Sequence, residues 1–170
     1  MAEGVHTEIE RKFVIDMPDA DFLRAQPGCE EWTIAQTYLT AQPGETRRVR
    51  RVVSAGQTRY FRTFKRRMTA LSAAEDEGEI TRAQYEAYLR ERDPARQTIE
   101  KTRLRIPWEG LLLEVDIYPF WQRQAVLEIE LEREDQPYAI PAWLRVRREV
   151  TDDIRYKNVM LAQNHEGLET

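Results

Sequence analysis

Charged residues occupy every second position in one segment of this chain after another. In the first such segment, Glu8, Glu10 and Lys12 lie two residues apart. The apolar Ile9 and Phe13 occupy the positions of opposite parity. Side chains two apart in a β-strand point the same way. The pattern therefore predicts strands with one charged face and one apolar face.

Eight segments alternate in this way, and short turns such as Gln42-Pro43-Gly44, Ser54-Ala55-Gly56-Gln57 and Glu109-Gly110 separate some of them, as expected for strands. They are residues 7–15, 34–39, 46–53, 58–65, 75–80, 99–107, 111–118 and 127–132. Helical patterns are fewer and cover residues 19–26, 81–90, 141–147 and 151–163. Eight short strands joined by tight turns are typical of a barrel or a sandwich. We expect an α+β protein that is mainly antiparallel β, folded as a single domain over residues 1–170.

The charged faces repeat in pairs of like sign. The later pairs are Arg48 with Arg50, Glu75 with Glu77, Lys101 with Arg103, Glu114 with Asp116, and Glu128 with Glu130. A half-exposed sheet with its charges in water would explain any one strand. Taken together, however, like charges side by side are unfavourable unless opposite charges lie near them. An eight-stranded closed β-barrel tunnel meets this need, with charged faces around the lumen, apolar faces under a few flanking helices, and no exposed sheet edge.

The basic side chains of the predicted lumen would repel one another unless they bound a polyanion. They are Lys12, Arg48, Arg50, Lys65, Lys101 and Arg103. Arginine matches pairs of phosphate oxygens, and lysine adds a point charge. Carboxylates beside a phosphate chain imply divalent cations that bridge the two kinds of oxygen. Without a Cys or His cluster, oxygen ligands favour Mg²⁺ or Mn²⁺ over zinc.

Composition excludes several other classes of protein. The net charge of −4 and the pI near 5.4 argue against a nucleic-acid partner. The chain has no stretch that approaches the length of a membrane span, so we expect no membrane partner. The single Cys29 fits a reducing compartment, and we expect a cytoplasmic protein. His6 and His165 lie near the chain ends, and we expect both at the surface.

The run Glu8-Ile9-Glu10-Arg11-Lys12 resembles the E-x-E-x-K signature of the CYTH superfamily, the triphosphate tunnel metalloenzymes. The resemblance continues in order over nearly the whole chain. It includes Arg48-Val49-Arg50, Tyr60-Phe61-Arg62-Thr63-Phe64-Lys65, Lys101-Thr102-Arg103, Glu114-Val115-Asp116, Glu128-Ile129-Glu130-Leu131, Glu149-Val150-Thr151 and Arg155-Tyr156-Lys157-Asn158. The family is known for an eight-stranded closed tunnel that binds a triphosphate with a divalent metal.

The resemblance implies a role for each matched residue. The metal ligands would be Glu8, Glu10, Glu128 and Glu130, with Glu114 and Asp116 binding the metal directly or through water. The phosphate-binding residues would be Lys12, Arg48, Arg50, Lys65, Lys101, Arg103 and Lys157. The catalytic set would be Glu8, Glu10, Lys12 and Glu128. Glu75 and Glu77 would orient a phosphate-binding side chain or the attacking water.

Lys157 falls on the apolar stripe of the predicted helix 151–163, where a lysine often extends to solvent, but its match to the family predicts that it reaches the tunnel end. Relatives often carry a further arginine just before the acidic strand, and here that place holds Ser72-Ala73-Ala74. Either that contact is missing, or Arg66 or Arg67 replaces it.

These residues predict a metal-dependent hydrolase of a small triphosphate, with inorganic tripolyphosphate as the expected substrate and diphosphate and phosphate as products. One alternative is a class IV adenylyl cyclase, which would form cyclic AMP from ATP in the same tunnel. Another is a non-catalytic polyphosphate- or nucleotide-binding module, which would not require the six carboxylates. The sequence leaves open the preferred metal and whether the protein is a monomer or a homodimer.

Overall fold

A single antiparallel sheet forms the body of the molecule. The structure is a computed structural model that describes residues 4–69 and 71–170. Within these residues the sheet has nine strands. They are β1 (Gly4–Asp16), β2 (Glu30–Leu39), β3 (Glu45–Ser54), β4 (Gln57–Arg67), β5 (Ser72–Ile80), β6 (Ile99–Trp108), β7 (Leu111–Ile117), β8 (Gln124–Leu131) and β9 (Val146–Glu149).

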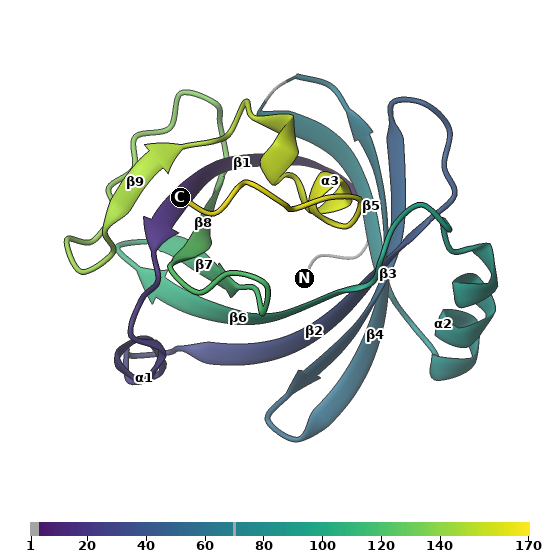
Figure 1. Cartoon of the computed structure of the whole chain (residues 1–170), viewed down its shortest axis with the longest axis horizontal. Helices are drawn as coiled ribbons and strands as arrows, with labels where there is room; N and C mark the ends of the chain where they lie inside the picture. The colour runs from purple at the N-terminus through teal and green to yellow at the C-terminus, as the bar shows by residue number, and fades with distance from the viewer. Residues whose placement is uncertain (1–3, 70) are drawn as a thin grey trace.

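Eight of these strands close into a barrel. Their order is β5-β4-β3-β2-β6-β7-β8-β1, and β1 pairs back with β5. The length of β1 makes this possible, because residues 4–9 pair with β5 while residues 9–16 pair with β8. Figure 1 shows the strands as a ring around a central space. The predicted eight-stranded closed barrel is confirmed, and β9 is a short addition beside β1.

The strand register places the charged faces in the interior. Lys12 lies opposite Glu128, and Lys65 lies opposite Glu75. Residues that are opposite in an antiparallel ladder have side chains on the same face of the sheet. The ladders around the ring therefore direct the predicted acidic and basic side chains into one shared lumen.

The largest hydrophobic core lies outside the barrel wall. It contains the alternate residues of four neighbouring strands, including Phe13, Ile15, Leu104, Ile106, Leu113, Val115, Leu127 and Ile129. Leu23 of α1 (Ala20–Arg24) and the segment 138–144 cover this surface. Each apolar side chain fully removed from water contributes about 1.5–3 kcal/mol to stability. The hydrophobic free energy is thus gained mainly on the face turned away from the lumen.

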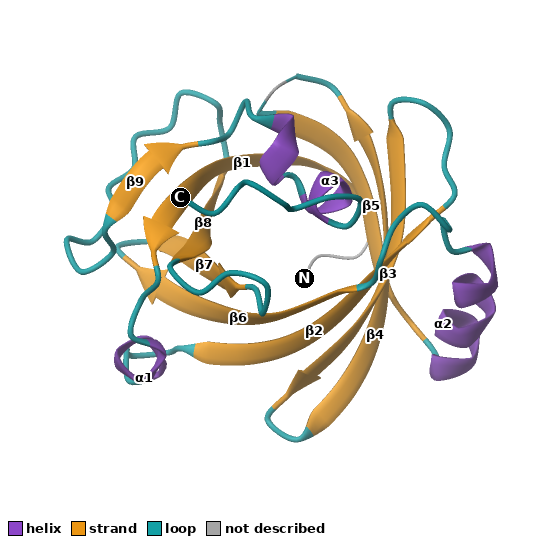
Figure 2. Cartoon of the chain, in the orientation of Figure 1, coloured by secondary structure: helices purple, strands orange, loops and turns teal. Residues whose placement is uncertain are grey.

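A second covering element is α2 (Arg82–Tyr88), which continues into the 3₁₀ helix η1 (Leu89–Glu91). Tyr85 of α2 packs with Leu39 and Val49 against the outside of the barrel. The helix begins with the predicted capping box, in which Thr81 and Gln84 each accept a backbone hydrogen bond from the other. Figure 2 shows α2 standing outside the strands. The predicted helix 81–90 is confirmed.

Clusters of apolar side chains flank the charged layer at both ends of the barrel. At one end Trp32, Ile34, Val52 and Phe61 form a buried cluster on the lumen face. At the other end the C-terminal segment crosses the opening, as Figure 1 shows for α3 and the C-terminus. Its buried side chains pack with Val14, Tyr38, Ile99, Tyr118 and Val126. The charged residues therefore occupy a layer in the middle of the barrel, between two apolar clusters.

The predicted helix 141–147 is wrong. Residues 142–144 form a turn, and β9 then pairs with residues 13–15 of β1. The exposed edge of β1 offers backbone hydrogen bonds there, and Arg147 binds Asp16 while Arg11 binds Glu149 at 2.7 Å. These long-range contacts outweigh a weak local preference for helix.

The predicted helix 151–163 is broken in the middle. It consists of the 3₁₀ helix η2 (Ile154–Tyr156) and the short α3 (Asn158–Leu161), with Lys157 in an extended conformation between them at ψ 137°. The fully buried Tyr156 donates a hydrogen bond to the carbonyl of Leu168, and Asn158 accepts one from Tyr118 at 2.5 Å. In the part of the chain that the structure describes, no helix is long and apolar enough to span a bilayer.

Candidate active site

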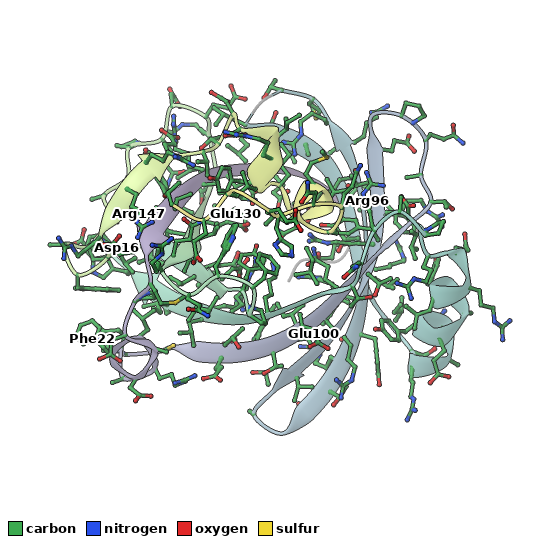
Figure 3. All side chains as sticks on the ribbon, in the orientation of Figure 1. Asp16, Phe22, Arg96, Glu100, Glu130 and Arg147 are labelled. Atoms are coloured by element: carbon green, nitrogen blue, oxygen red, sulfur yellow. The ribbon has the colours of Figure 1, made fainter. Side chains whose placement is uncertain are left out.

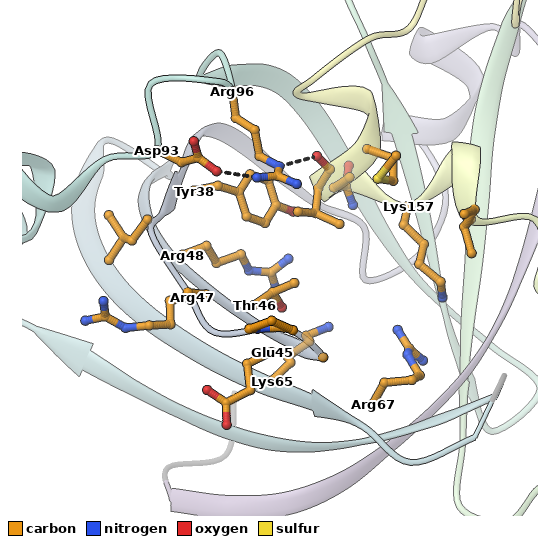
Figure 4. A pocket seen from close by; sticks show the side chains of 18 of the residues that line it. Tyr38, Glu45, Thr46, Arg47, Arg48, Lys65, Arg67, Asp93, Arg96 and Lys157 are labelled. Carbon is orange, nitrogen blue, oxygen red and sulfur yellow. Dashed lines mark hydrogen bonds and ion pairs between the residues drawn. The ribbon is translucent and has the colours of Figure 1, made fainter.

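A cavity of about 720 Å³ opens at the end of the barrel where the β2–β3 loop, the end of β4 and the C-terminal segment meet. Its basic lining residues are Lys12, Arg47, Arg48, Lys65, Arg67, Arg96 and Lys157. Its acidic lining residues are Glu10, Glu45 and Asp93. Figure 4 shows many of these basic side chains gathered around one space. The cavity is strongly positive although the chain as a whole is negative.

Three of these cations have no acidic partner in the part of the chain that the structure describes. Within residues 4–69 and 71–170, no carboxylate lies within ion-pair distance of Arg48, Arg67 or Lys157. Among the same residues, the buried Nε of Arg48 has no hydrogen-bond acceptor. Burial, together with the positive charges of Arg67 and Lys12, lowers the pKa of Lys157 to about 8. This arrangement would gain from a bound anion.

Below the cavity, the charges neutralise one another. The Lys65 ammonium group lies 2.6 Å from Glu8 and 3.0 Å from Glu75. Lys12 lies 3.2 Å from Glu128. Lys65 and Lys12 also line the cavity, so each can contact a bound anion while it holds a carboxylate. These two lysines connect the phosphate-binding part of the lumen to its acidic part.

Arg50 and Glu77 form a second buried pair at 3.0 Å, and the Thr63 hydroxyl donates to the same Glu77 oxygen at 2.8 Å. Burial opposes ionisation of Glu77, but Arg50 and Arg48 outweigh it and keep the pKa of Glu77 below its usual range. Glu77 and Glu75 thus each lie against a basic side chain.

Arg103 is the centre of the largest ion-pair network. Its Nε lies 2.7 Å from Asp116, its Nη1 lies 3.1 Å from Glu114, and its Nη2 lies 3.2 Å from Glu128. Lys101 also contacts Asp116, at 2.7 Å. Burial lowers the pKa of Lys101 to about 8, although the charge of Asp116 opposes this shift. Lys101 and Arg103 do not line the cavity.

Glu10 and Glu130 lie opposite each other in the β1–β8 ladder. In the described part of the chain neither forms an ion pair with a basic side chain. Burial, reinforced by the charges of Glu128 and Glu8, raises the pKa of Glu10 to about 7. The pKa of Glu130 is also raised, first by desolvation and then by Glu8 and Glu114. Glu130 is the exposed member of the set, and Figure 3 shows it within the ring of strands.

The oxygen donors of these carboxylates suit a divalent cation chemically, but their positions do not form a complete coordination site. Among the described residues, no three Asp, Glu, His or Cys side chains converge closely enough to hold an ion. Glu8, Glu114, Asp116 and Glu128 share their oxygens with basic side chains. Glu10 and Glu130 keep unneutralised carboxylates, and hard oxygen donors of this kind suit Mg²⁺ or Mn²⁺. A bound divalent cation would stabilise the ionised form of both carboxylates and so lower both pKa values.

The structure places Lys157 on the cavity for a different reason from the one the sequence offered. The sequence put it on the apolar stripe of a continuous helix, whereas it projects from the break between η2 and α3. Arg67 also lines the cavity, and Arg66 lies at the opposite parity of β4. Of the two arginines, Arg67 is therefore the one that lies on the cavity, near the position just before the acidic strand where relatives often carry an arginine.

Sequence reasoning missed three residues at the site. His6 was expected at the surface, but it is half-buried with Nε2 3.4 Å from Glu75, and its spacing from Glu8 could have revealed this. Tyr38 lines the cavity opposite Arg48, and strand parity was again a usable signal. Arg96 lies in a loop, where its Nε donates to the Val159 carbonyl at 3.0 Å, and no sequence pattern indicated that contact.

Comparison with known proteins identifies the family. No family model matches the chain. The inorganic triphosphatase of Nitrosomonas europaea is 36% identical over 162 residues, which cover 92% of this chain and 97% of that protein. A crystal structure of the inorganic triphosphatase NE1496 matches with a TM-score of 0.55 and 30% identity, covering 94% of this chain and 97% of that chain. The chain belongs to the CYTH superfamily of triphosphate tunnel metalloenzymes.

Other structures share the CYTH fold at lower identity. PH1819 from Pyrococcus horikoshii has a TM-score of 0.59 at 18% identity, covering 75% of this chain and 80% of that one. HpAC1 from Hippeastrum, described as having a dominant triphosphatase activity, has a TM-score of 0.51 at 17% identity, covering 74% and 80%. CYTH membership implies an enzyme that requires a divalent metal, and the predicted family and fold are confirmed.

Proposed function

We propose that this protein hydrolyses inorganic tripolyphosphate to diphosphate and phosphate inside its tunnel, with Mg²⁺ or Mn²⁺ as the cofactor. One observation carries the proposal. Three basic side chains, Arg48, Arg67 and Lys157, have no acidic partner among the described residues, and they face a cavity that also reaches Glu10, whose carboxylate forms no ion pair there. A phosphate chain would satisfy the cations, and a divalent ion between the chain and the carboxylates would satisfy the acids.

The basic residues would bind and orient the phosphate chain. Arg48, with its unsatisfied Nε, offers a directional contact to phosphate oxygens. Lys12 and Lys65 extend the positive surface inward. Arg50 lies deeper on the same face of β3 as Arg48, and Lys101 and Arg103 complete the positive wall of the lumen. The chain would thus enter from the cavity with its terminal phosphate foremost.

The acidic residues would hold the metal and direct the water. When bound, the ion supplies charge neutralisation and lowers the pKa of a coordinated water. Glu8, Glu10 and Glu130 would provide its oxygens, with Glu114 and Asp116 behind them. Glu128, fixed by Lys12 and Arg103, would orient the water for in-line attack on the terminal phosphorus. The bond to the bridging oxygen breaks, diphosphate leaves, and Lys12 stabilises the charge that develops on the phosphoryl oxygens.

The class IV adenylyl cyclase alternative would use the same phosphate-binding residues. Its nucleoside would have to lie at the outer edge of the cavity, which Ile154, Val159 and Met160 make partly apolar. An apolar surface gives little discrimination between one organic group and another. We therefore expect recognition to depend on the phosphates, and hydrolysis of tripolyphosphate to exceed cyclisation of ATP.

A substrate panel tests the proposal. Tripolyphosphate, ATP, thiamine triphosphate and a longer polyphosphate are each incubated with Mg²⁺ and with Mn²⁺, and phosphate, diphosphate and cyclic AMP are measured. We expect phosphate release from tripolyphosphate to be fastest, and Glu10→Gln, as a control for contaminating phosphatases, to abolish it. Cyclic AMP formed from ATP at a rate equal to or above tripolyphosphate cleavage would instead support the cyclase.

A further inference from the structure

Lys157 reaches the cavity from a bend in the C-terminal segment. It is extended between η2 and α3, and Figure 4 shows its side chain directed toward that of Arg67. In the described part of the chain no carboxylate forms an ion pair with Lys157, so an acidic partner does not set its direction. The helix α3 has only four residues, and a helix of that length has little stability of its own. The direction of Lys157 therefore depends on the contacts that hold this bend against the barrel.

The residues on both sides of Lys157 are held by the barrel. The carbonyl of Tyr156 accepts a hydrogen bond from the Lys12 ammonium group at 3.3 Å. The side-chain oxygen of Asn158 accepts one from the Tyr118 hydroxyl at 2.5 Å. Asn158 is 8% exposed and Tyr118 is fully buried, so water cannot readily replace the hydrogen bond between them. This bond ties the residue next to Lys157 to the end of β7, which Tyr118 follows directly.

Tyr118 lies behind the wall of the cavity. It is fully buried, and it is not among the described residues that line the cavity. The rings of Phe120 and Trp121 pack against it, with centroids 5.1 and 5.2 Å from that of Tyr118. Because these contacts involve the ring alone, Tyr118→Phe would keep the packing and lose only the hydrogen bond. Any influence of the hydroxyl on substrate binding would therefore pass through Asn158.

We propose that Tyr118 is a positioning residue for phosphate binding. Its hydroxyl fixes Asn158, and Asn158 fixes the direction in which Lys157 enters the cavity. The inference rests on the proposed function, in which Lys157 binds the phosphate chain. A displaced ammonium group makes a weaker contact with a phosphate oxygen, because hydrogen bonds between charged groups depend closely on distance and angle. Loss of a hydroxyl that does not touch the substrate should therefore weaken substrate binding.

The test combines Tyr118→Phe with Lys157→Met. The dissociation constant of tripolyphosphate is measured by calorimetry in the presence of a chelator, and KM and kcat are measured with Mg²⁺. We expect Lys157→Met to raise the dissociation constant about tenfold and Tyr118→Phe to raise it about threefold or more. KM should follow the dissociation constant, with kcat changed less. In the Lys157→Met background, Tyr118→Phe should change the dissociation constant by less than about 1.5-fold, because the residue through which the hydroxyl acts is absent.

Two further variants complete the comparison. Asn158→Ala removes the acceptor and should weaken binding at least as much as Tyr118→Phe, with no further loss when the two are combined. Tyr85→Phe is the matched control, since it removes a tyrosine hydroxyl from α2 on the outside of the barrel. It should leave the dissociation constant and kcat unchanged. Thermal unfolding shows which variants are folded, and Asn158→Ala provides the same comparison with Lys157→Met if Tyr118→Phe does not fold.

The outcomes separate this inference from the proposed function. Unchanged binding by a folded Tyr118→Phe protein would overturn the inference. An equal loss of affinity with and without Lys157 would also overturn it, since the hydroxyl would then support the site as a whole. Wild-type protein that binds tripolyphosphate without cleaving it would refute the proposed function, and the calorimetric comparison would still test the role of Tyr118. Wild-type protein that neither binds nor cleaves tripolyphosphate would refute both.

Discussion

Glu10 and Glu128 lie on adjacent strands, and burial disfavours the ionised form of both, but their surroundings differ. Lys12 and Arg103 outweigh the burial of Glu128 and hold its pKa well below the usual range. Glu10 forms no such ion pair with any described residue, and burial together with neighbouring acids raises its pKa to about 7. A single residue's charge state in this tunnel therefore depends on which basic side chains reach it.

The first prediction concerns Glu10→Gln. Because the folded-state pKa of Glu10 is raised above its unfolded value, its ionisation destabilises the fold, and this cost grows as pH rises from about 4.5 through 7. Glutamine removes the cost. We expect the metal-free variant to exceed wild type in free energy of unfolding by roughly 1–3 kcal/mol at pH 8, with little difference at pH 4.5. Urea unfolding in the presence of a chelator measures this.

Glu132→Gln is the control for that prediction, since Glu132 is exposed and lies just after β8. It should leave stability unchanged at both pH values. The same Glu10→Gln protein should have lost metal-dependent turnover. A variant that is no more stable at pH 8 than wild type would contradict the idea that Glu10 carries an uncompensated charge.

The second prediction concerns Lys157. Its pKa is lowered to about 8, first by burial and then by Arg67 and Lys12, so at pH 8.5 a large fraction of the side chain is neutral. A bound polyanion favours the charged form and should raise that pKa, so binding should take up a proton. Calorimetric titration with tripolyphosphate at pH 8.5, in two buffers of different ionisation enthalpy, measures the uptake. Lys157→Met should reduce it, and equal heats in both buffers for wild type would contradict the prediction.

At the scale of elements, we expect α2 to contribute to the stability of the fold and not to the activity of the site. Thr81→Ala removes the side-chain half of the capping box and should lower the free energy of unfolding by about 0.5–2 kcal/mol. Because α2 packs on the outside of the barrel, kcat/KM for tripolyphosphate should not change. Thr81→Ser keeps the capping oxygen and should retain most of the stability. Loss of activity in a folded Thr81→Ala protein would show that α2 influences the lumen.

The sequence predicted correctly those elements whose local pattern of charged and apolar residues agrees with their long-range contacts. Strand parity predicted the barrel because the charged and apolar faces of β1, β7 and β8 differ so clearly. It failed where distant contacts decide the local structure. Residues 146–149 become β9 because the edge of β1 accepts them, and the helix expected over 151–163 breaks at Lys157 because Tyr156 and Asn158 bind partners elsewhere.

The same distinction applies to the site. The residues that share the lumen could be predicted, since one face of a strand can be read from alternate positions. Which acid pairs with which base could not, because that depends on register between strands distant in the sequence. Arg103 is an example: its contacts with Glu114 and Glu128 arise from two different ladders.

At the scale of the whole molecule, the sign of the net charge opposes the sign of the cavity. The chain carries −4, whereas basic residues dominate the cavity lining. If the local field attracts the substrate, raising ionic strength from about 0.05 to 0.5 M should lower kcat/KM for tripolyphosphate on the order of tenfold. If the net charge controlled approach, salt would raise kcat/KM instead. Stopped-flow or steady-state rates at fixed metal activity distinguish the two.

The position of the main hydrophobic core outside the barrel wall has a consequence for how such a protein can change. Residues such as Leu104 and Leu113 stabilise the strands from one side, while Arg103 and Glu114 act from the other. A substitution in the lumen therefore leaves most of the apolar packing intact. Natural selection or protein engineering can therefore change the side chains that line the lumen, and with them its chemistry, while the strands and their apolar packing stay the same.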